Sequence, residues 1–233
     1  MYKVGLVIPS SNTTMEPEFH QIMEPYATVH TSRLRLRKVT APELEVMERD
    51  AERAACELSD ADVDVICYGC TSGSLLRGIG HDKQLVHRIE SATGIPAVAT
   101  AGAVVDALRH LGLKRISVAT PYTREINAIE SRFLKDSGFG VLNILGLGLT
   151  ENTEIGLQSA QVAYKLARRS YVADADGVFI SCTNFHTLDV IAKLEDELSK
   201  PTVSSNTATA WKVCQKLRIT NNIHGYGQLL ALT

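Results

Sequence analysis

The sequence lacks several features that would place it at once in a class of proteins. No apolar run is long enough to span a membrane, and the apolar stretch at the N-terminus, MYKVGLVIPSS, is too short for a secretion signal. Neither sign of charge is in excess, with 24 Lys and Arg against 26 Asp and Glu. These absences predict a cytoplasmic protein with no membrane partner and no nucleic-acid partner.

Cysteine is also scarce. Five cysteines are an odd number, in a chain of 233 residues that is too long for a disulfide scaffold, so we expect reduced thiols. Cys67 and Cys70 form a C-x-x-C motif, but Cys67 lies inside a predicted strand and not at the helix start that redox motifs require. We therefore expect Cys67, and likewise Cys56 and Cys214, to be core thiols. The glycines form no G-x-G-x-x-G motif, which argues against a dinucleotide site.

An internal repeat is the main feature that the sequence does contain. Pro9 and Pro121 lie 112 positions apart, and so do Cys70 and Cys182. The matching segments are VGLVIPSSN with ISVATPYT, and DADVDVICYGCTS with DADGVFISCTN. A third pair, IPAVATAG and KPTVSSNT, follows each cysteine segment at a spacing of 105. A shared spacing across separate motifs indicates two copies of one unit.

Amphipathic helical stretches lie between the predicted strands, at residues 43–58, 83–93, 154–171 and 187–198. This alternation predicts an α/β fold with two pseudo-symmetric lobes, each a parallel sheet covered by helices. We expect the first lobe to comprise residues 1–98 plus 206–233 and the second to comprise residues 99–205. Thr13 to Glu16 read as a capping box at the start of a helix.

Each copy carries a Cys-Thr pair, Cys70-Thr71 and Cys182-Thr183, where a predicted strand runs into a predicted helix. Ligands of open α/β sheets bind beyond the carboxyl ends of the strands, so the pairs are expected on opposite walls of one cleft. A helix N-terminus lowers a thiol pKa and binds anions. One such cysteine alone is more often a small core residue, but two at equivalent positions favour a site. A zinc site would need His186 as well, and no further residue has ligand spacing.

These motifs resemble those of the aspartate/glutamate racemase superfamily over nearly the whole chain. Within it, VIPSSNTTMEPE, GCTSG, ATPYT, ENTEIG and SCTNF are similar to motifs of maleate cis-trans isomerases. The resemblance implies a homodimeric enzyme that needs no cofactor and converts maleate, a small dicarboxylate, to fumarate. It also implies a site that contains Asn12, Cys70, Tyr122, Asn152 and Cys182. The neighbouring hydroxyl groups of Thr71, Ser72 and Thr183 are further candidates for substrate binding.

Three alternatives remain at this point. Amino-acid racemases of the same superfamily use the same two thiols, but usually carry an acidic residue where Asn12 stands and often a His where Asn184 stands. Arylmalonate decarboxylases keep only the second cysteine, so Cys70 argues against that activity. A two-lobed binding module for small anions, which is not an enzyme, would need neither thiol.

The resemblance suggests a mechanism in which the two thiols act differently. The Cys70 thiolate adds to one alkene carbon, and Cys182 gives a proton to the other, so that the bond between them can rotate. A free thiol has a pKa of about 8.5, so Cys70 needs activation whereas Cys182 must keep its proton. The sequence indicates different surroundings only through the preceding residues, Gly69 in one copy and Ser181 in the other.

Overall fold

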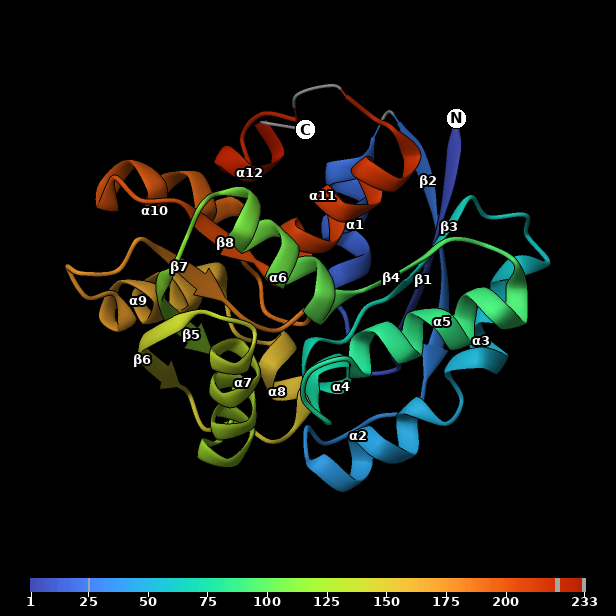
Figure 1. The fold of residues 1–233 in the computed structure, drawn as a ribbon, viewed down its shortest axis with the longest axis horizontal. Coiled ribbons are helices and arrows are strands. Elements are labelled where there is room, and N and C mark those ends of the chain that lie inside the picture. Colours follow the sequence, from blue (N-terminus) through green and yellow to red (C-terminus); the bar gives the residue numbers. More distant parts are fainter. Residues whose placement is uncertain (25, 221–222, 232–233) are drawn as a thin grey trace.

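Two four-stranded parallel sheets form the frame of the molecule, as Figure 1 shows for the computed structural model. The structure describes residues 1–24, 26–220 and 223–231. The first sheet has the order β2-β1-β3-β4 and the second the order β6-β5-β7-β8. The strands are β1 (Tyr2–Pro9), β2 (Ala27–Leu34), β3 (Val65–Tyr68), β4 (Ala97–Ala99), β5 (Arg115–Thr120), β6 (Gly140–Gly146), β7 (Gly177–Ile180) and β8 (Thr202–Ser204). The predicted two-lobed α/β fold is confirmed.

The inner strands are buried on both faces because helices cover both faces of each sheet. Val4 to Ile8 of β1 and all four residues of β3 and of β7 are buried. Such continuous apolar strands are typical of parallel sheets, and they explain why the sequence shows apolar runs there in place of alternation. The carboxyl ends of β3 and β7 lead directly to Cys70 and Cys182.

The internal repeat is visible in individual hydrogen bonds. Asp64 accepts a bond from the Lys3 N–H at 2.7 Å, and Asp176 accepts the equivalent bond from the Arg115 N–H at 2.7 Å. Each pair of equivalent residues is separated by the same 112 positions that separate the two cysteines. These carboxylates fasten the start of the central strand to the segment before β3 or β7, and so set the register that brings each cysteine to its place.

The helices differ from their predicted lengths in three places. Residues 43–58 form two helices with a break at Arg49 and Asp50. Residues 154–171 also form two, because Ser159, a residue type that favours helix starts, begins a new one. Residues 187–198 begin as a 3-10 turn. The helices are α1 (Met15–Met23), α2 (Ala41–Glu48), α3 (Ala51–Ser59), α4 (Thr71–Leu75), α5 (His81–Thr93), α6 (Thr100–His110), α7 (Arg124–Asp136), α8 (Asn152–Gly156), α9 (Ala160–Ser170), η1 (Leu188–Val190), α10 (Ile191–Leu198), α11 (Ser205–Leu217) and α12 (Gln228–Ala231).

Helix α1 begins where the sequence predicts, but the predicted capping box is wrong. Thr14 makes no side-chain cap. The Asn12 side chain replaces it, because its Oδ1 accepts hydrogen bonds from the Thr14 and Met15 N–H groups, both at 3.0 Å. Asparagine is as effective as threonine at satisfying the free N–H groups of a helix start.

The burial of the cysteines follows the predictions at two positions and contradicts them at one. Cys67 and Cys214 are buried, as expected, whereas Cys56 is exposed because it lies on the solvent side of α3. Helices α6 and α11, which follow β4 and β8, pack against each other, and the Thr209 hydroxyl donates to Thr100 Oγ1 at 3.2 Å. In the described part of the chain, no helix has the length and apolarity needed to cross a bilayer.

Candidate functional site

Cys70 caps the N-terminus of α4. Its backbone is extended, with φ −144° and ψ 109°, and its Sγ accepts a hydrogen bond from the Gly73 N–H at 3.4 Å. The Ser72 hydroxyl lies 3.7 Å from the same sulfur. Gly73 must stay small, since a Cβ there would meet the Tyr68 hydroxyl at 2.9 Å and Cys70 Sγ at 3.2 Å. The predicted helix start after the first Cys-Thr pair is confirmed.

Cys182 lies in a different local structure, and the predicted helix start after the second Cys-Thr pair is wrong. Residues 183–187 form a turn and a loop, and the next helical residue is Leu188. Cys182 has a φ of +95°, a conformation that residues with a Cβ rarely adopt. The turn still aims one N–H at the sulfur, because the Asn184 N–H donates to Cys182 Sγ at 3.4 Å.

Ser205, a residue that the sequence did not single out, joins the two Cys-Thr pairs. Its Oγ accepts a hydrogen bond from Thr71 Oγ1 at 2.8 Å and another from the Cys182 N–H at 3.0 Å. A second link runs through Thr183, whose hydroxyl donates to the Gly69 carbonyl at 3.0 Å. The turns after β3 and β7 are therefore bonded to each other, although more than 100 residues separate them in sequence.

Asn12 and Asn152 are both buried, and their side chains bond to other parts of the protein. Asn12 Nδ2 donates to Thr183 Oγ1 at 3.0 Å, and its Oδ1 caps α1. Asn152 Nδ2 donates to Ser11 Oγ at 2.8 Å, and the backbone carbonyl of Asn152 accepts from Asn184 Nδ2 at 2.7 Å. The structure thus brings Asn12 next to the second Cys-Thr pair, whereas Asn152 contacts the neighbouring turns.

Tyr122 completes the group around the thiols. It is buried at the end of β5, and burial raises the pKa of its hydroxyl well above the ordinary value, with further contributions from Cys182 and Cys70. Burial also raises the pKa of the Cys182 thiol to about 12, although hydrogen bonds from Tyr122 and from the Asn184 N–H act in the opposite direction. Burial raises the pKa of Cys70 too, against hydrogen bonds from Gly73 and Ser72.

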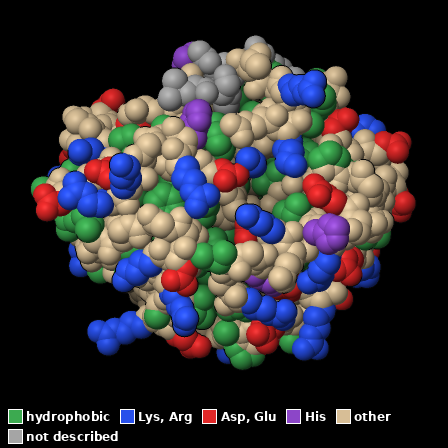
Figure 2. All heavy atoms as spheres, in the orientation of Figure 1, with side chains coloured by type: hydrophobic (Ala, Val, Ile, Leu, Met, Phe, Trp, Pro, Cys, Tyr) green, Lys and Arg blue, Asp and Glu red, His purple; other side chains and the backbone are tan. Residues whose placement is uncertain are grey.

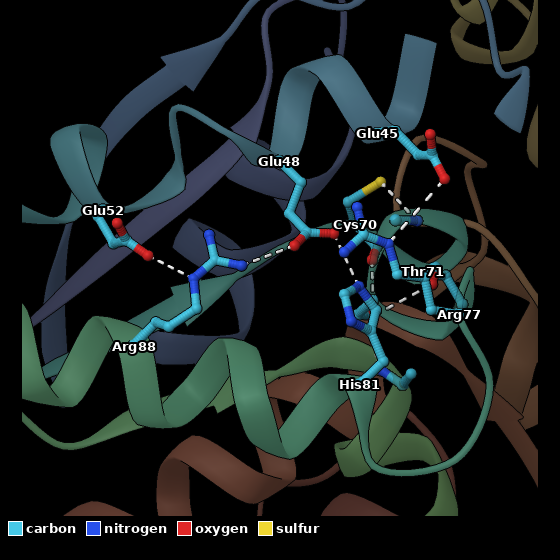
Figure 3. A network of polar contacts seen from close by, with 11 residues as sticks. Glu45, Glu48, Glu52, Cys70, Thr71, Arg77, His81 and Arg88 are labelled. Carbon is cyan, nitrogen blue, oxygen red and sulfur yellow. Dashed lines mark hydrogen bonds and ion pairs between the residues drawn. The ribbon is translucent and has the colours of Figure 1, made fainter. Parts of the chain in front are cut away.

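A network of charges lies beside Cys70, as Figure 3 shows; Glu48 and His81 are buried in it, whereas Arg88 and Glu52 are partly exposed. Glu48 accepts from His81 Nε2 at 2.7 Å and from Arg88 at 2.8 Å, and Arg88 also pairs with Glu52. Burial alone would raise the pKa of Glu48, but the contacts with His81 and Arg88 outweigh it and lower that pKa. The Glu48 carboxylate is therefore ionised and neutralised by its partners, and it acts on Cys70 only as a minor cause of the raised thiol pKa.

A hollow on the described surface lies between α5, α6, α7 and α11, and neither thiol lines it. Both thiols are buried, each 5% exposed. On the face shown in Figure 2, Lys and Arg side chains are interspersed with Asp and Glu side chains. Among the described residues, no group of three or more His, Cys, Asp or Glu could hold a metal ion.

The site is thus a pair of buried thiols at equivalent ends of two repeated sheets, each thiol facing one backbone N–H donor. A thiolate can add to an electron-poor carbon, and a thiol can donate a proton. Backbone and hydroxyl donors around them can stabilise negative charge on a carboxylate. This is the class of two-lobed α/β enzymes that use paired cysteines.

Comparison with known proteins gives the family. Residues 4–230 match the family model described as arylmalonate decarboxylase. The chain is 32% identical to a maleate isomerase from Geobacillus stearothermophilus, over 99% of this chain and 97% of that protein. The chain therefore belongs to the arylmalonate decarboxylase family. The chain is also 28% identical to an arylmalonate decarboxylase from Bordetella bronchiseptica, over 89% of this chain and 87% of that protein.

Two solved structures have nearly the same fold. A maleate isomerase from Pseudomonas putida S16, solved with maleate, matches with a TM-score of 0.96 and 29% identity over 100% of this chain and 98% of that chain. A maleate cis-trans isomerase from Nocardia farcinica matches with a TM-score of 0.96 and 26% identity over 100% and 99%. That structure is a cysteine-to-serine variant with a covalently bound succinylcysteine intermediate.

Proposed function

We propose that this protein isomerises maleate to fumarate through a covalent bond to Cys70. The observation that carries the proposal is the pair of buried thiols, Cys70 and Cys182, whose turns are bonded to each other through Ser205. The succinylcysteine in the Nocardia farcinica relative supports a covalent thiol adduct in this family. These relatives favour the isomerase over the racemase and over the binding module that is not an enzyme.

The chemistry needs one thiolate and one thiol. The Cys70 sulfur forms a bond to one alkene carbon, and the π electrons move to the adjacent carbon and its carboxylate. The Cys182 proton moves to that carbon, which leaves a single bond that can rotate and a Cys182 thiolate. The thiolate then takes the proton back, the carbon–sulfur bond breaks, and fumarate leaves with the Cys70 thiolate restored.

The substrate-binding group in this proposal comprises Asn12, Thr71, Ser72, Tyr122, Asn152 and Thr183. The Tyr122 hydroxyl, near both thiols, is a donor to a substrate carboxylate. Asn12 and Thr183, which bond to each other, shape the wall beside Cys182. Asn152 positions Ser11 and Asn184, to which it is hydrogen-bonded.

Three further points belong to the proposal. We propose a homodimer, tested by light scattering of the purified protein, and a cytoplasmic location, which five free cysteines support. We also propose that residues 1–98 plus 206–233 and residues 99–205 form the two lobes; the separation of β1–β4 from β5–β8 into two sheets supports this division, although its boundary cuts β4 before Ala99. Residues 25, 221–222 and 232–233 of that division lie outside the described part of the chain.

Proton NMR of the purified protein with maleate tests the proposed function directly. We expect fumarate to accumulate without an added cofactor and in the presence of a chelator. Exchange of the α-hydrogen of aspartate or glutamate in deuterated solvent, without turnover of maleate, would instead identify a racemase. A requirement for added zinc would contradict the cofactor-independent mechanism.

A further inference from the structure

Glu130 is a buried acid that the mechanism above does not use. It lies on the inner face of α7 and is 0% exposed. Its Oε1 accepts a hydrogen bond from Ser181 Oγ at 2.5 Å, while its Oε2 has no hydrogen-bond partner in the described part of the chain. Ser181 is the residue directly before Cys182. One hydrogen bond and one residue of backbone therefore connect this carboxyl group to the second thiol.

Among the described residues, no ion pair includes Glu130. The elements packed most closely against α7 are β6 and α4, and neither Gly140–Gly146 nor Thr71–Leu75 contains a charged residue. The charged residues of α7 itself face solvent; they are Arg124, Glu125, Arg132, Lys135 and Asp136. The titratable groups on which Glu130 acts are Cys182 and Tyr122.

The other copy of the repeat provides a comparison for this arrangement. Glu18 on α1 precedes Glu130 by the same 112 positions and is also buried. Both of its oxygens are satisfied, because Oε1 accepts from the Thr187 and Leu188 N–H groups and Oε2 accepts from Asn206 Nδ2. Glu18 thus fastens a loop, whereas the equivalent Glu130 keeps one oxygen free beside a thiol.

We propose that Glu130 is a positioning residue that, together with Ser181, reinforces the effect of burial in keeping Cys182 in its protonated form. An acid buried without a cation opposes the appearance of a second negative charge nearby. The proposal rests on the proposed function, in which Cys182 is the proton donor and Cys70 is the nucleophile. The acid beside Cys70 is in a different environment, because Glu48 accepts hydrogen bonds from His81 and Arg88, whereas one oxygen of Glu130 has no hydrogen-bond partner in the described part of the chain.

The pH range of this effect follows from the titration of Glu130 itself. Burial raises the pKa of Glu130 to about 7, against the hydrogen bond from Ser181, which lowers it. Below this pH the carboxyl group is neutral and exerts little effect on Cys182. Above it the carboxylate forms and adds to the effect of burial on the Cys182 thiol, whose pKa lies at about 12.

The test measures the ionisation of Cys182 without using isomerase activity. In a Cys70→Ser background, the rate at which iodoacetamide alkylates Cys182 is followed across alkaline pH by peptide mass spectrometry. The reagent is neutral, so its approach does not depend on the charge of Glu130. We expect Glu130→Gln to raise the alkylation rate of Cys182 by about threefold at pH 8 to 9, where Glu130 is ionised in the parent protein and the thiol is still largely protonated. An unchanged pH dependence would overturn the proposal.

Two further variants make the result specific. Glu18→Gln is the same substitution at the equivalent position of the first copy, and we expect it to lower the melting temperature but leave the pH dependence of Cys182 unchanged. An equal shift in both variants would contradict a specific role. Ser181→Ala removes the bond that lowers the pKa of Glu130. It should therefore speed alkylation just above neutral pH and lose this effect at higher pH, where Glu130 ionises anyway.

A kinetic measurement then connects the inference to the reaction. With both thiols present, the alkaline limb of the pH profile of maleate turnover should move to lower pH in Glu130→Gln, in parallel with the alkylation data. If the parent protein does not turn over maleate, the proposed function fails, while the alkylation result still decides the role of Glu130. If the alkylation shifts and the alkaline limb does not, Cys182 is not the proton donor and the inference is wrong.

Discussion

The two thiols lie at equivalent ends of two repeated sheets, but the residues that pack behind them differ in polarity. Around Gly69, the residue before Cys70, the packing is apolar, whereas the residues at the equivalent positions around Ser181 are polar. Each position in the second copy lies 112 residues after its equivalent in the first; the pairs are Ile8 with Thr120, Met15 with Asn127, and Gly69 with Ser181. The Thr120 hydroxyl donates to Asn127 Oδ1 at 2.5 Å, where the first copy has only apolar contact.

Gly69 and Ser181 show how this difference is maintained. A Cβ at Gly69 would meet Met15 Sδ at 2.4 Å and Ile8 Cγ2 at 2.7 Å, so the first copy has no room for a side chain there. In the second copy the side chain of Ser181 has room and reaches Glu130. A duplicated fold can thus keep its hydrogen bonds and still place two identical side chains in different surroundings.

The largest expected effect comes from replacing the thiols themselves. Cys70→Ser should abolish turnover, because a serine hydroxyl is far harder to ionise than a thiol. Cys182→Ser should lose about 10²–10⁴-fold in rate, the usual contribution of a positioned proton donor. Intact-protein mass spectrometry after brief incubation with maleate should show a succinyl adduct on Cys70 in Cys182→Ser and no adduct in Cys70→Ser. An adduct on Cys182 alone would reverse the two roles, and full activity of either variant would refute the two-thiol mechanism.

A second effect concerns Asn12, which belongs to the first copy but bonds to the second. Asn12→Ala should reduce turnover on the order of a hundredfold, as the loss of one donor at an anionic site does. Because Asn12 also caps α1, we expect a loss of about 1–2 kcal/mol in the free energy of unfolding. Asn12→Asp is the matched control, since its carboxylate keeps the cap but cannot donate to Thr183. Turnover by Asn12→Asp at the parent rate would show that only the cap matters.

A third effect is the pH dependence of stability that Glu130 imposes on the second copy. Its pKa is about 7 in the folded protein against an ordinary value of 4.5, so the folded state binds more protons between these values. Its contribution is therefore fully present below pH 4.5 and is lost as the pH rises through 7, by about 3 kcal/mol in all. The measurement is urea unfolding at pH 5 and pH 8, which covers most of this loss. In Glu130→Gln we expect the free energy of unfolding to change less between these two pH values than in the parent protein. Glu125→Gln, exposed on the same helix, should behave like the parent.

The smallest effect tests the backbone difference between the two cysteines. Cys182 has a φ of +95°, which a residue with a Cβ adopts at a cost of about 1–2 kcal/mol. Cys182→Gly should therefore be more stable than Cys182→Ala, by about 1 kcal/mol in urea unfolding. At Cys70, where the backbone is extended, glycine should be less stable than alanine by about 0.5–1 kcal/mol. The same order at both positions would show that the positive φ of Cys182 stores no strain.

Much of the fold was predictable from the sequence because it depends on local patterns. The buried runs of β1 and β3 follow from apolar segments of the sequence, and the repeat follows from a constant spacing. The break at Arg49 and Asp50 was not predictable, since neither Gly nor Pro lies there and the buried face stays in phase across it.

The sequence by itself determined the two-lobed α/β architecture and the equivalence of Cys70 and Cys182. A signal for Glu130 was also present, because it shares the 112-residue spacing with Glu18. Only the tertiary structure decided that Ser205 joins the two turns, that Cys182 precedes a loop and not a helix, and that Glu130 lacks the partners that Glu18 has. The physical reason is that hydrogen-bond satisfaction and burial depend on residues far apart in the chain, which no local pattern specifies.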